Sequence, residues 1–196
     1  HHLIFGRDPA DCLWTILRGI LVCVCAVLTG RGENGMEEIE YQKMAQLEET
    51  NWWYHARKDL IHRLVRRFHG DPKYIIDIGC GNGMVLASFP EAKKIGIEVH
   101  PIAAANAKKK GITVFSDMKE AEDGADVILL MDVLEHVKED HVFLKTVLDK
   151  LALGGVAIIT VPAFQWMWSH HDERTHHFRR YSRGTLLECI KKAGAE

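Results

Sequence analysis

A glycine-rich turn follows directly after an apolar run in the middle of the chain. The run Ile75–Ile78 includes the acidic residue Asp77 and continues as Gly79-Cys80-Gly81-Asn82-Gly83. Glycine lets the backbone turn this sharply and approach a ligand this closely. A dinucleotide-binding turn of the Gly-x-Gly-x-x-Gly type needs glycine at position 84, where this chain has Met84. The turn therefore indicates a ligand site, but not a pyrophosphate cradle.

A second carboxylate, that of Glu98, lies nineteen positions after Gly79. It ends the next apolar run, where its oxygens could accept hydrogen bonds from the two hydroxyls of a ribose. Taken alone, Asp77 could simply hold the N–H groups of the loop, and Glu98 could be a solvated strand end. The two carboxylates at this spacing together favour a ligand that contains adenosine.

Short β-branched runs alternate with helical patterns along the chain after Met36, and the first helical pattern extends to about His69. The expected strands are Tyr74–Ile78, Lys94–Glu98, Ile112–Phe115, Asp126–Met131 and Val156–Val161. The expected helices are Met84–Phe89, Pro101–Lys110, Asp117–Glu122, Lys138–Leu151 and Arg183–Ala193. This order predicts an α/β fold with a doubly wound, mostly parallel sheet. Ligands bind such sheets at the carboxyl ends of the strands, so the site is expected in the loops that follow them.

The two ends of the chain depart from this pattern. Residues 1–35 contain the apolar run Leu13–Leu28, which is shorter than the ~20 residues that a transmembrane helix needs. We expect residues 1–35 to be a leader, a cloning remnant or another segment outside the domain, and residues 36–196 to form the domain. Cys23 and Cys25 are interpreted as apolar filler. At the other end, we expect the last strands of the sheet to be missing, which would leave the edge beside Val156–Val161 uncovered.

The composition excludes several classes of protein. The 196 residues have a net charge of −2 and are 47% hydrophobic, as in a globular protein of one domain. No uniform basic field is present, so nucleic acid is not an expected partner. Stable membrane insertion is not expected either. The five cysteines are an odd number at irregular spacing, which predicts reduced thiols and a cytoplasmic location.

The turn, the second carboxylate and a later segment resemble a known enzyme family. Asp77 to Gly83, Glu98, and the run Asp126–Val137 with its Leu-Glu-His sequence are similar to the Rossmann-like class I S-adenosylmethionine-dependent methyltransferases. The resemblance implies that the glycine-rich loop holds the methionine part of the cofactor and that Glu98 holds the ribose. It also implies that Asp117 and Met118 flank the adenine. The expected cofactor-binding residues are Arg57, Asp77, Gly79, Cys80, Gly81, Asn82, Gly83, Glu98, Asp117, Met118 and Asp132.

Two further segments resemble a largely bacterial subgroup of these methyltransferases. The first is the aromatic cluster Trp52-Trp53-Tyr54, which precedes Arg57. The second is the stretch Val161–Tyr181, which contains the pattern HDE…HxRRY. The resemblance implies that the two segments close over the site, the first near the cofactor and the second near the acceptor. The aromatic cluster is equally consistent with a staple between a helix and the sheet.

The second segment also supplies the candidate catalytic residues. His171 is the first choice as the group that takes a proton from the acceptor, because Asp172 or Glu173 could orient it. His136, at the end of the fourth expected strand, is the second choice. The residues expected to support acceptor binding are Arg179, Arg180 and Tyr181.

A metal site is a minority hypothesis. Asp132-x-x-Glu135-His136 resembles an acidic-x-x-Glu-His metal site of some oxygen methyltransferases, but it begins with Asp. Consecutive Glu and His at the junction of a strand and a helix are more often structural, so the sequence leads us to assign no metal ligand.

We therefore expect a methyltransferase that moves a methyl group from S-adenosylmethionine to a small-molecule or glycan-like acceptor, with O-methylation favoured. A protein that binds S-adenosylmethionine without turnover, as a regulatory module, is the alternative from another class. An NAD-dependent oxidoreductase is disfavoured by Met84. The sequence predicts neither the acceptor nor the oligomeric state.

Overall fold

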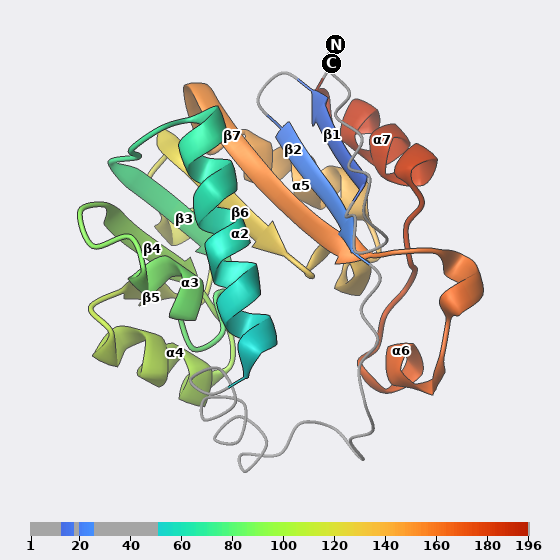
Figure 1. Cartoon of the computed structure of the whole chain (residues 1–196), viewed down its shortest axis with the longest axis horizontal. Coiled ribbons are helices and arrows are strands. Elements are labelled where there is room, and N and C mark those ends of the chain that lie inside the picture. The colour runs from blue at the N-terminus through green and yellow to red at the C-terminus, as the bar shows by residue number, and fades with distance from the viewer. Residues whose placement is uncertain (1–12, 18–19, 26–50, 196) are drawn as a thin grey trace. The chain divides into compact units, whose positions relative to one another are not determined.

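The computed structural model of the protein describes residues 13–17, 20–25 and 51–195 (Figure 1). The expected helical pattern of residues 36–50 and most of residues 1–35 lie outside these ranges. The chain divides into two compact units. Of the described residues, one unit contains 51–129 and 151–156, and the other contains 13–17, 20–25, 130–150 and 157–195.

The first unit has the alternating order that the sequence predicts. Its elements are α2 (Trp52–Phe68), β3 (Tyr74–Ile78), α3 (Met84–Ala87), β4 (Lys93–Ile97), α4 (Pro101–Lys109), β5 (Thr113–Phe115), the 3-10 helix η1 (Met118–Glu120) and most of β6 (Ala125–Met131). Strand β4 pairs in parallel with β3 on one side and with β5 on the other. Side chains of β3 and β6 that form the core of this unit are fully buried, as at Ile75, Ile76, Val127, Ile128 and Leu129.

The second unit contains the end of β6 and the elements that follow it. These are η2 (Leu134–His136), α5 (Asp140–Leu148), the second half of β7 (Leu151–Pro162), η3 (Gln165–Met167), α6 (His170–Arg174) and α7 (Arg183–Lys192). Its core is made by apolar side chains of η2, α5, β7 and α7, among them Leu134, Leu144, Ile158, Leu186 and Ile190.

The strands form one hydrogen-bonded order, β1-β2-β7-β6-β3-β4-β5. Strand β3 is the first of the five predicted strands in the chain, and it lies between β6 and β4. A doubly wound sheet requires such a place for its first strand. The prediction of a Rossmann-like α/β fold is confirmed.

The predicted end of one helix is wrong. Helix α5 ends at Leu148, whereas the expected helix extended to Leu151, which is instead the first residue of β7. Leu144 and Val147 are fully buried and complete the inward face of the helix without it. Gly155 lies within this strand, and a Cβ atom there would lie 2.8 Å from the carbonyl oxygen of Ala125. A larger residue there would prevent this close approach of the two backbones.

The edge of β7 that was expected to be uncovered is paired. Strand β2 (Ile20–Cys25) lies parallel to β7 from Ala157 to Pro162, and β1 (Leu13–Leu17) pairs antiparallel with β2. Unpaired backbone groups at a sheet edge favour the addition of a strand, and the β-branched and apolar residues of Ile20–Cys25 suit that role. This part of residues 1–35 is thus placed in the sheet.

None of the helices in the described part of the chain has the length and apolar character that crossing a bilayer requires.

Candidate active site

Asp77 lies near the end of β3 with only 1% of its surface exposed. Its Oδ1 atom has no hydrogen-bond partner among the described residues. Burial raises the pKa of Asp77 to about 8, Arg57 opposes this rise by its positive charge, and Glu98 adds to it. A buried carboxyl oxygen without a partner needs a compensating group, and a ligand ammonium would supply one.

The glycine-rich loop after β3 is held mainly by bonds within the protein. The N–H groups of Gly79 and Cys80 both donate to the carbonyl oxygen of Ile97, at 2.8 and 3.3 Å. The N–H group of Gly83 donates to the carbonyl oxygen of Cys80 at 2.9 Å. These three bonds within the protein thus fix the shape of the loop.

Two glycines of the loop, Gly81 and Gly83, have positive φ angles but different surroundings. Gly83 has φ +75° at the N-cap of α3, and a Cβ atom there would lie 2.5 Å from the Cδ1 atom of Ile112. Gly81 has φ +53°, and a Cβ atom there would meet nothing within 4 Å. The loop is therefore packed at Gly83 and open at Gly81, which leaves room for a ligand beside the latter.

Glu98 follows β4 directly, and its side chain is hydrogen-bonded to the glycine-rich loop. Its Oε2 atom accepts a hydrogen bond from the backbone N–H group of Gly81 at 2.9 Å, and its Oε1 atom accepts one from the backbone N–H group of His100 at 2.7 Å. Each carboxylate oxygen has a second acceptor position, so hydrogen bonds to ribose hydroxyls are compatible with these contacts.

The other expected cofactor residues of this unit have varied surroundings. The buried Asn82 accepts a hydrogen bond from the side chain of Asn106 at 3.1 Å. Asp117 is exposed and caps η1 through the N–H group of Lys119, while Met118 is buried. Cys80 is buried and lies against Gly96, where a Cβ atom would come within 2.5 Å of its sulfur, which agrees with a packing role for Cys80.

Asp132 lies in the other unit, after β6. Its N–H group donates to the carbonyl oxygen of Thr160, and its Oδ1 atom accepts from the hydroxyl of Thr160, both at 2.9 Å. Asp132 has φ 56°, which is uncommon for a residue other than glycine. The two contacts to β7 hold it in this conformation.

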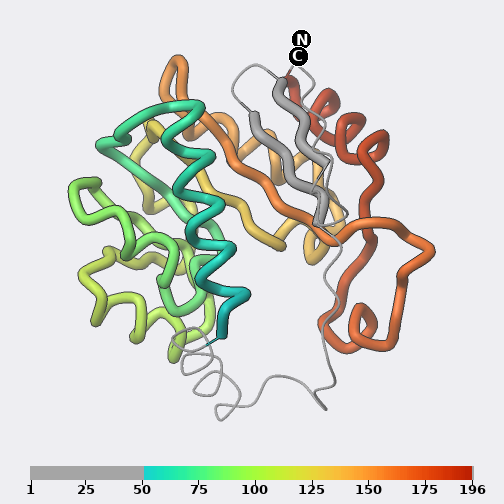
Figure 2. The backbone as a smooth tube through the Cα atoms, in the orientation of Figure 1, coloured from blue at the N-terminus to red at the C-terminus, as the bar shows by residue number. Residues whose placement is uncertain are grey.

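Asp172 is the centre of the segment that leaves β7. This segment runs through η3 and α6 and returns at Tyr181, which forms a parallel bridge with Ala163 (Figure 2). Asp172 is fully buried, and its carboxylate accepts hydrogen bonds from Arg180 Nε at 2.7 Å and Arg180 Nη2 at 2.8 Å. It also accepts one from Ser169 N at 2.8 Å, and it pairs with His177 Nδ1 at 2.9 Å. Burial would raise the pKa of Asp172, but the bonds from Arg180, Ser169 and His177 outweigh it and hold this pKa below its ordinary value.

The partner predicted for His171 is therefore wrong. Asp172 orients His177 rather than His171, and the carboxylate of Glu173 pairs with His170 at 3.0 Å. The reason is the turn of α6, whose capping box directs Asp172 back to Ser169 and into the buried interior. Burial and the nearby His177 lower the pKa of His171, so its imidazole is neutral and able to accept a proton.

The residues expected to support the acceptor are mostly engaged inside the protein. Tyr181 is 1% exposed and donates its hydroxyl hydrogen to Asp140 at 2.9 Å. Arg179 pairs with the same carboxylate at 2.6 Å. Arg180 is buried against Asp172. The structure does not support acceptor contacts by Arg180 and Tyr181 and gives them a role in holding the segment.

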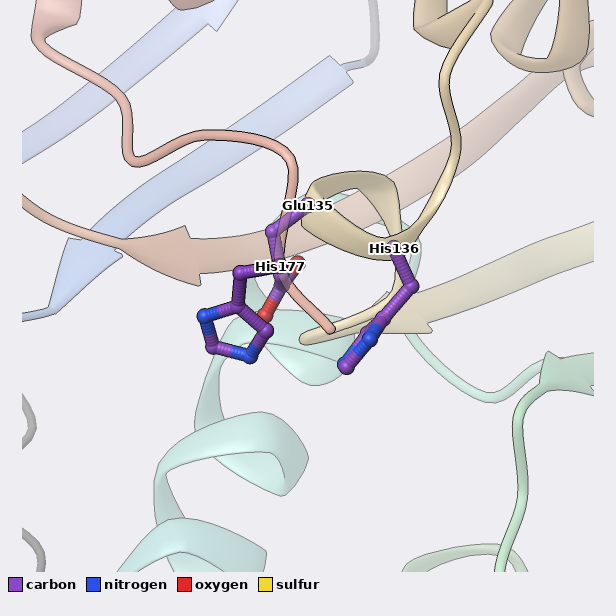
Figure 3. A group of neighbouring side chains, drawn as sticks. All are labelled: Glu135, His136 and His177. Atoms are coloured by element: carbon purple, nitrogen blue, oxygen red, sulfur yellow. The ribbon is translucent and has the colours of Figure 1, made fainter. Parts of the chain in front are cut away.

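Three potential metal-ligating side chains come together in this unit. Ligand atoms of Glu135, His136 and His177 all lie within 4.8 Å of one another (Figure 3). The rings of His136 and His177 meet edge to face at 4.6 Å between centroids. Desolvation and the adjacent His177 lower the pKa of His136, which favours its neutral form. The sequence singled out Glu135 and His136 but not His177, which is 41 positions after His136 in the printed sequence.

A family described as a methyltransferase domain matches residues 52–196. The chain belongs to this family. Its members' methyl donor, S-adenosylmethionine, is the cofactor that the family and the fold imply, and the open, carboxylate-lined loop around Asp77 and Glu98 fits it.

Relatives in other organisms carry names of the same kind. The chain is 30% identical to methyltransferase str2 of Strobilurus tenacellus over 57% of this chain and 46% of that protein. It is 27% identical to a ubiquinone biosynthesis O-methyltransferase of Cereibacter sphaeroides over 62% of this chain and 60% of that protein. The chain thus spans about half the length of these relatives.

Solved structures show the same fold at low sequence identity. The N-methyltransferase NodS of Bradyrhizobium japonicum, solved with S-adenosyl-L-homocysteine, has a TM-score of 0.59 at 18% identity, over 78% of this chain and 84% of that one. The plantazolicin methyltransferase BamL has a TM-score of 0.61 at 17% identity, over 80% of this chain and 68% of that one.

Proposed function

We propose that this protein transfers a methyl group from S-adenosylmethionine to a hydroxyl oxygen of a small-molecule or glycan-like acceptor. The observation that carries the proposal is the methyltransferase-domain match together with the buried, unpartnered Oδ1 atom of Asp77 beside the open loop. The O-methyltransferase names among the relatives support oxygen as the methylated atom. The HDE…HxRRY subgroup is part of the same proposal.

In this proposal most of the residues that hold the cofactor belong to the first unit. Asp77 pairs with its ammonium group, the loop from Gly79 to Gly83 lies against its methionine part, and Glu98 binds its ribose. Asp117 and Met118 flank the adenine, and Arg57 and Asp132 complete the set. When bound, S-adenosylmethionine supplies an electrophilic methyl group on a sulfonium ion.

The residues of the second unit handle the acceptor. Displacement at the methyl carbon requires the acceptor oxygen to lose its proton as the new bond forms. His171 takes that proton at its neutral imidazole, and His136 is the second candidate. Holding both reactants in line supplies much of the acceleration, because the donor is already reactive.

The partners and location belong to the same proposal. We infer a small-molecule acceptor rather than nucleic acid or membrane, and a cytoplasmic protein. The cysteines among the described residues with a side chain placed, Cys80 and Cys189, are free and buried, which agrees with reduced thiols.

The proposal is tested by titrating the full chain calorimetrically with S-adenosylmethionine, S-adenosylhomocysteine and NAD. We expect binding of the first two and none of NAD. Turnover is then measured as S-adenosylhomocysteine formed with a panel of phenols, hydroxy acids, sugars and amines. Binding of NAD alone would overturn the proposal, and binding of S-adenosylmethionine with no turnover on any acceptor would favour the regulatory module.

A further inference from the structure

The cluster Glu135, His136 and His177 joins two segments that are far apart in sequence. Glu135 and His136 belong to η2, and His177 belongs to the segment between α6 and α7 (Figure 3). The backbone N–H group of Phe178 donates to the carbonyl oxygen of Glu135 at 2.7 Å. This bond fixes the neighbouring His177 beside η2, so the meeting of the three side chains is built into the backbone.

His177 is oriented by a buried carboxylate. Its Nδ1 atom pairs with Asp172 Oδ1 at 2.9 Å, and Arg180 holds that carboxylate in place. With Nδ1 so engaged, Nε2 is the atom that His177 can offer to a ligand. Metal-ligating histidines commonly have such a carboxylate on their other ring nitrogen, where it fixes the tautomer and raises the basicity of the ligand.

Glu135 and His136 are also suited to binding a metal ion. Glu135 is 1% exposed, whereas His136 is exposed, so the cluster has one protected side and one accessible side. Four-coordinate zinc needs ligand atoms roughly 3.4 Å apart, which follows from Zn–N distances of about 2.0–2.1 Å. Since the three atoms lie within 4.8 Å of one another, small side-chain rotations would bring them into that range.

We propose that Glu135, His136 and His177 bind one divalent transition-metal ion of the zinc class, with an open coordination position for an oxygen atom of the methyl acceptor. Two imidazoles and one carboxylate favour zinc, cobalt or nickel over magnesium and calcium, which prefer all-oxygen sites. Asp132 is not a member of the set, and its Oδ1 atom accepts from Thr160.

The role of the ion rests on the proposed function. A hydroxyl bound to such an ion loses its proton more readily, because the metal charge stabilises the alkoxide or phenolate. This narrows the acceptor to molecules with an ionisable hydroxyl that can reach a metal, such as phenols, enols and hydroxy acids. Glu135, His136 and His177 bind the ion, so with metal present His136 is a ligand and the proton of the hydroxyl goes to His171. Asp172 is a positioning residue that acts through His177.

The experiment uses metal-free full-length protein, prepared by chelation and dialysis and titrated with zinc chloride. We expect one tight equivalent by calorimetry, and with cobalt a visible absorption band typical of nitrogen and oxygen ligands. His136→Ala and His177→Ala should each weaken zinc binding at least tenfold. His170→Ala is the matched control, because His170 lies on the same segment but pairs with Glu173, and it should leave zinc binding unchanged.

Asp172→Asn tests the positioning role and should weaken zinc binding by about ten- to hundredfold while keeping the stoichiometry at one. Because His136 is exposed, His136→Ala should fold normally, and it decides the matter if the other variants unfold. Wild-type protein that binds no zinc, or zinc binding that His136→Ala leaves unchanged, would overturn the inference. S-adenosylmethionine binding is measured on the same samples. Wild-type protein that binds zinc but does not bind S-adenosylmethionine would contradict the proposed function and leave the metal site standing.

Discussion

The Oε2 atom of Glu98 accepts a hydrogen bond from the backbone nitrogen of Gly81 at 2.9 Å. Glu98 thereby shapes the loop that it is also proposed to complete as a ribose-binding residue. Glu98→Ala should weaken S-adenosylmethionine binding by about 1–3 kcal/mol, because both the ribose hydroxyls and the loop lose a charged acceptor. Isothermal titration calorimetry measures this change. Glu91→Ala, at an exposed acidic residue between α3 and β4, is the control, and equal affinity in the two variants would refute the assignment of Glu98.

The raised pKa of Asp77 predicts that the stability of the protein falls as the pH rises. Its pKa in the folded protein, about 8, lies above its ordinary value of 3.8. The folded state therefore favours the protonated carboxyl group. Its contribution to the free energy of unfolding is fully present below about pH 4 and is lost as the pH rises to about 8. Urea unfolding of the ligand-free protein at pH 5 and pH 8 should show a decline that Asp77→Asn reduces by at least about 1 kcal/mol. Parallel pH profiles for the two proteins would show that Asp77 is ionised in the folded state.

Gly83 and Gly111 form a matched pair for testing the packing of the loop. Both have nearly the same φ, +75° and +76°, but only at Gly83 would a Cβ atom meet neighbours within 4 Å, Ile112 and Ala107. Gly111→Ala should reduce the free energy of unfolding by about 1–2 kcal/mol through backbone strain. Gly83→Ala should reduce it by about 1–3 kcal/mol more, through overpacking. If urea unfolding gave the same value for both, the contact with Ile112 would be relieved at no cost.

Arg180 and Asp172 form a buried ion pair whose members should not act independently. Arg180→Met leaves the Asp172 carboxylate buried without its main partner and should cost about 3–5 kcal/mol of stability. The double variant Asp172→Leu with Arg180→Met removes both charges and should be less destabilised than the single variant. A double-mutant cycle by urea unfolding measures the difference. Additive effects of the two substitutions would mean that the pair contributes no coupling energy.

The sequence alone predicts the strands, and it singles out the two carboxylates that are proposed to hold the cofactor, for a clear physical reason. The strand Tyr74–Ile78 is an apolar run bounded by glycine and a proline-containing turn, and local composition decides its type. Asp77 and Glu98 are found because strand ends in a parallel sheet meet at one edge. These signals are local or depend on sheet topology, which the alternation of elements specifies.

Side-chain partners in the segment after β7 could not be predicted in the same way. Asp172 pairs with His177 rather than with His171 because of the short helix α6 and the backbone hydrogen bond from Phe178 to Glu135. Four histidines in this segment, at 170, 171, 176 and 177, have the same chemistry in the sequence, and only the path of the backbone distinguishes them. The pairing of β2 with β7 likewise requires contacts over more than 130 positions, which no local pattern reveals.

His171 is the residue with which the proposed proton transfer can be tested most directly. Among the residues that the structure describes, its imidazole has no carboxylate partner, since Asp172 pairs with His177 and Glu173 pairs with His170. If it takes the acceptor proton, His171→Ala should lower turnover by about a hundredfold or more and leave S-adenosylmethionine affinity within a factor of a few, because the group acts only in the transition state. Turnover is measured as S-adenosylhomocysteine formed at saturating cofactor, with His170→Ala as the control that keeps activity. Loss of cofactor affinity in His171→Ala with unchanged turnover at saturation would instead make this segment a cover over the cofactor and place the proton acceptor elsewhere.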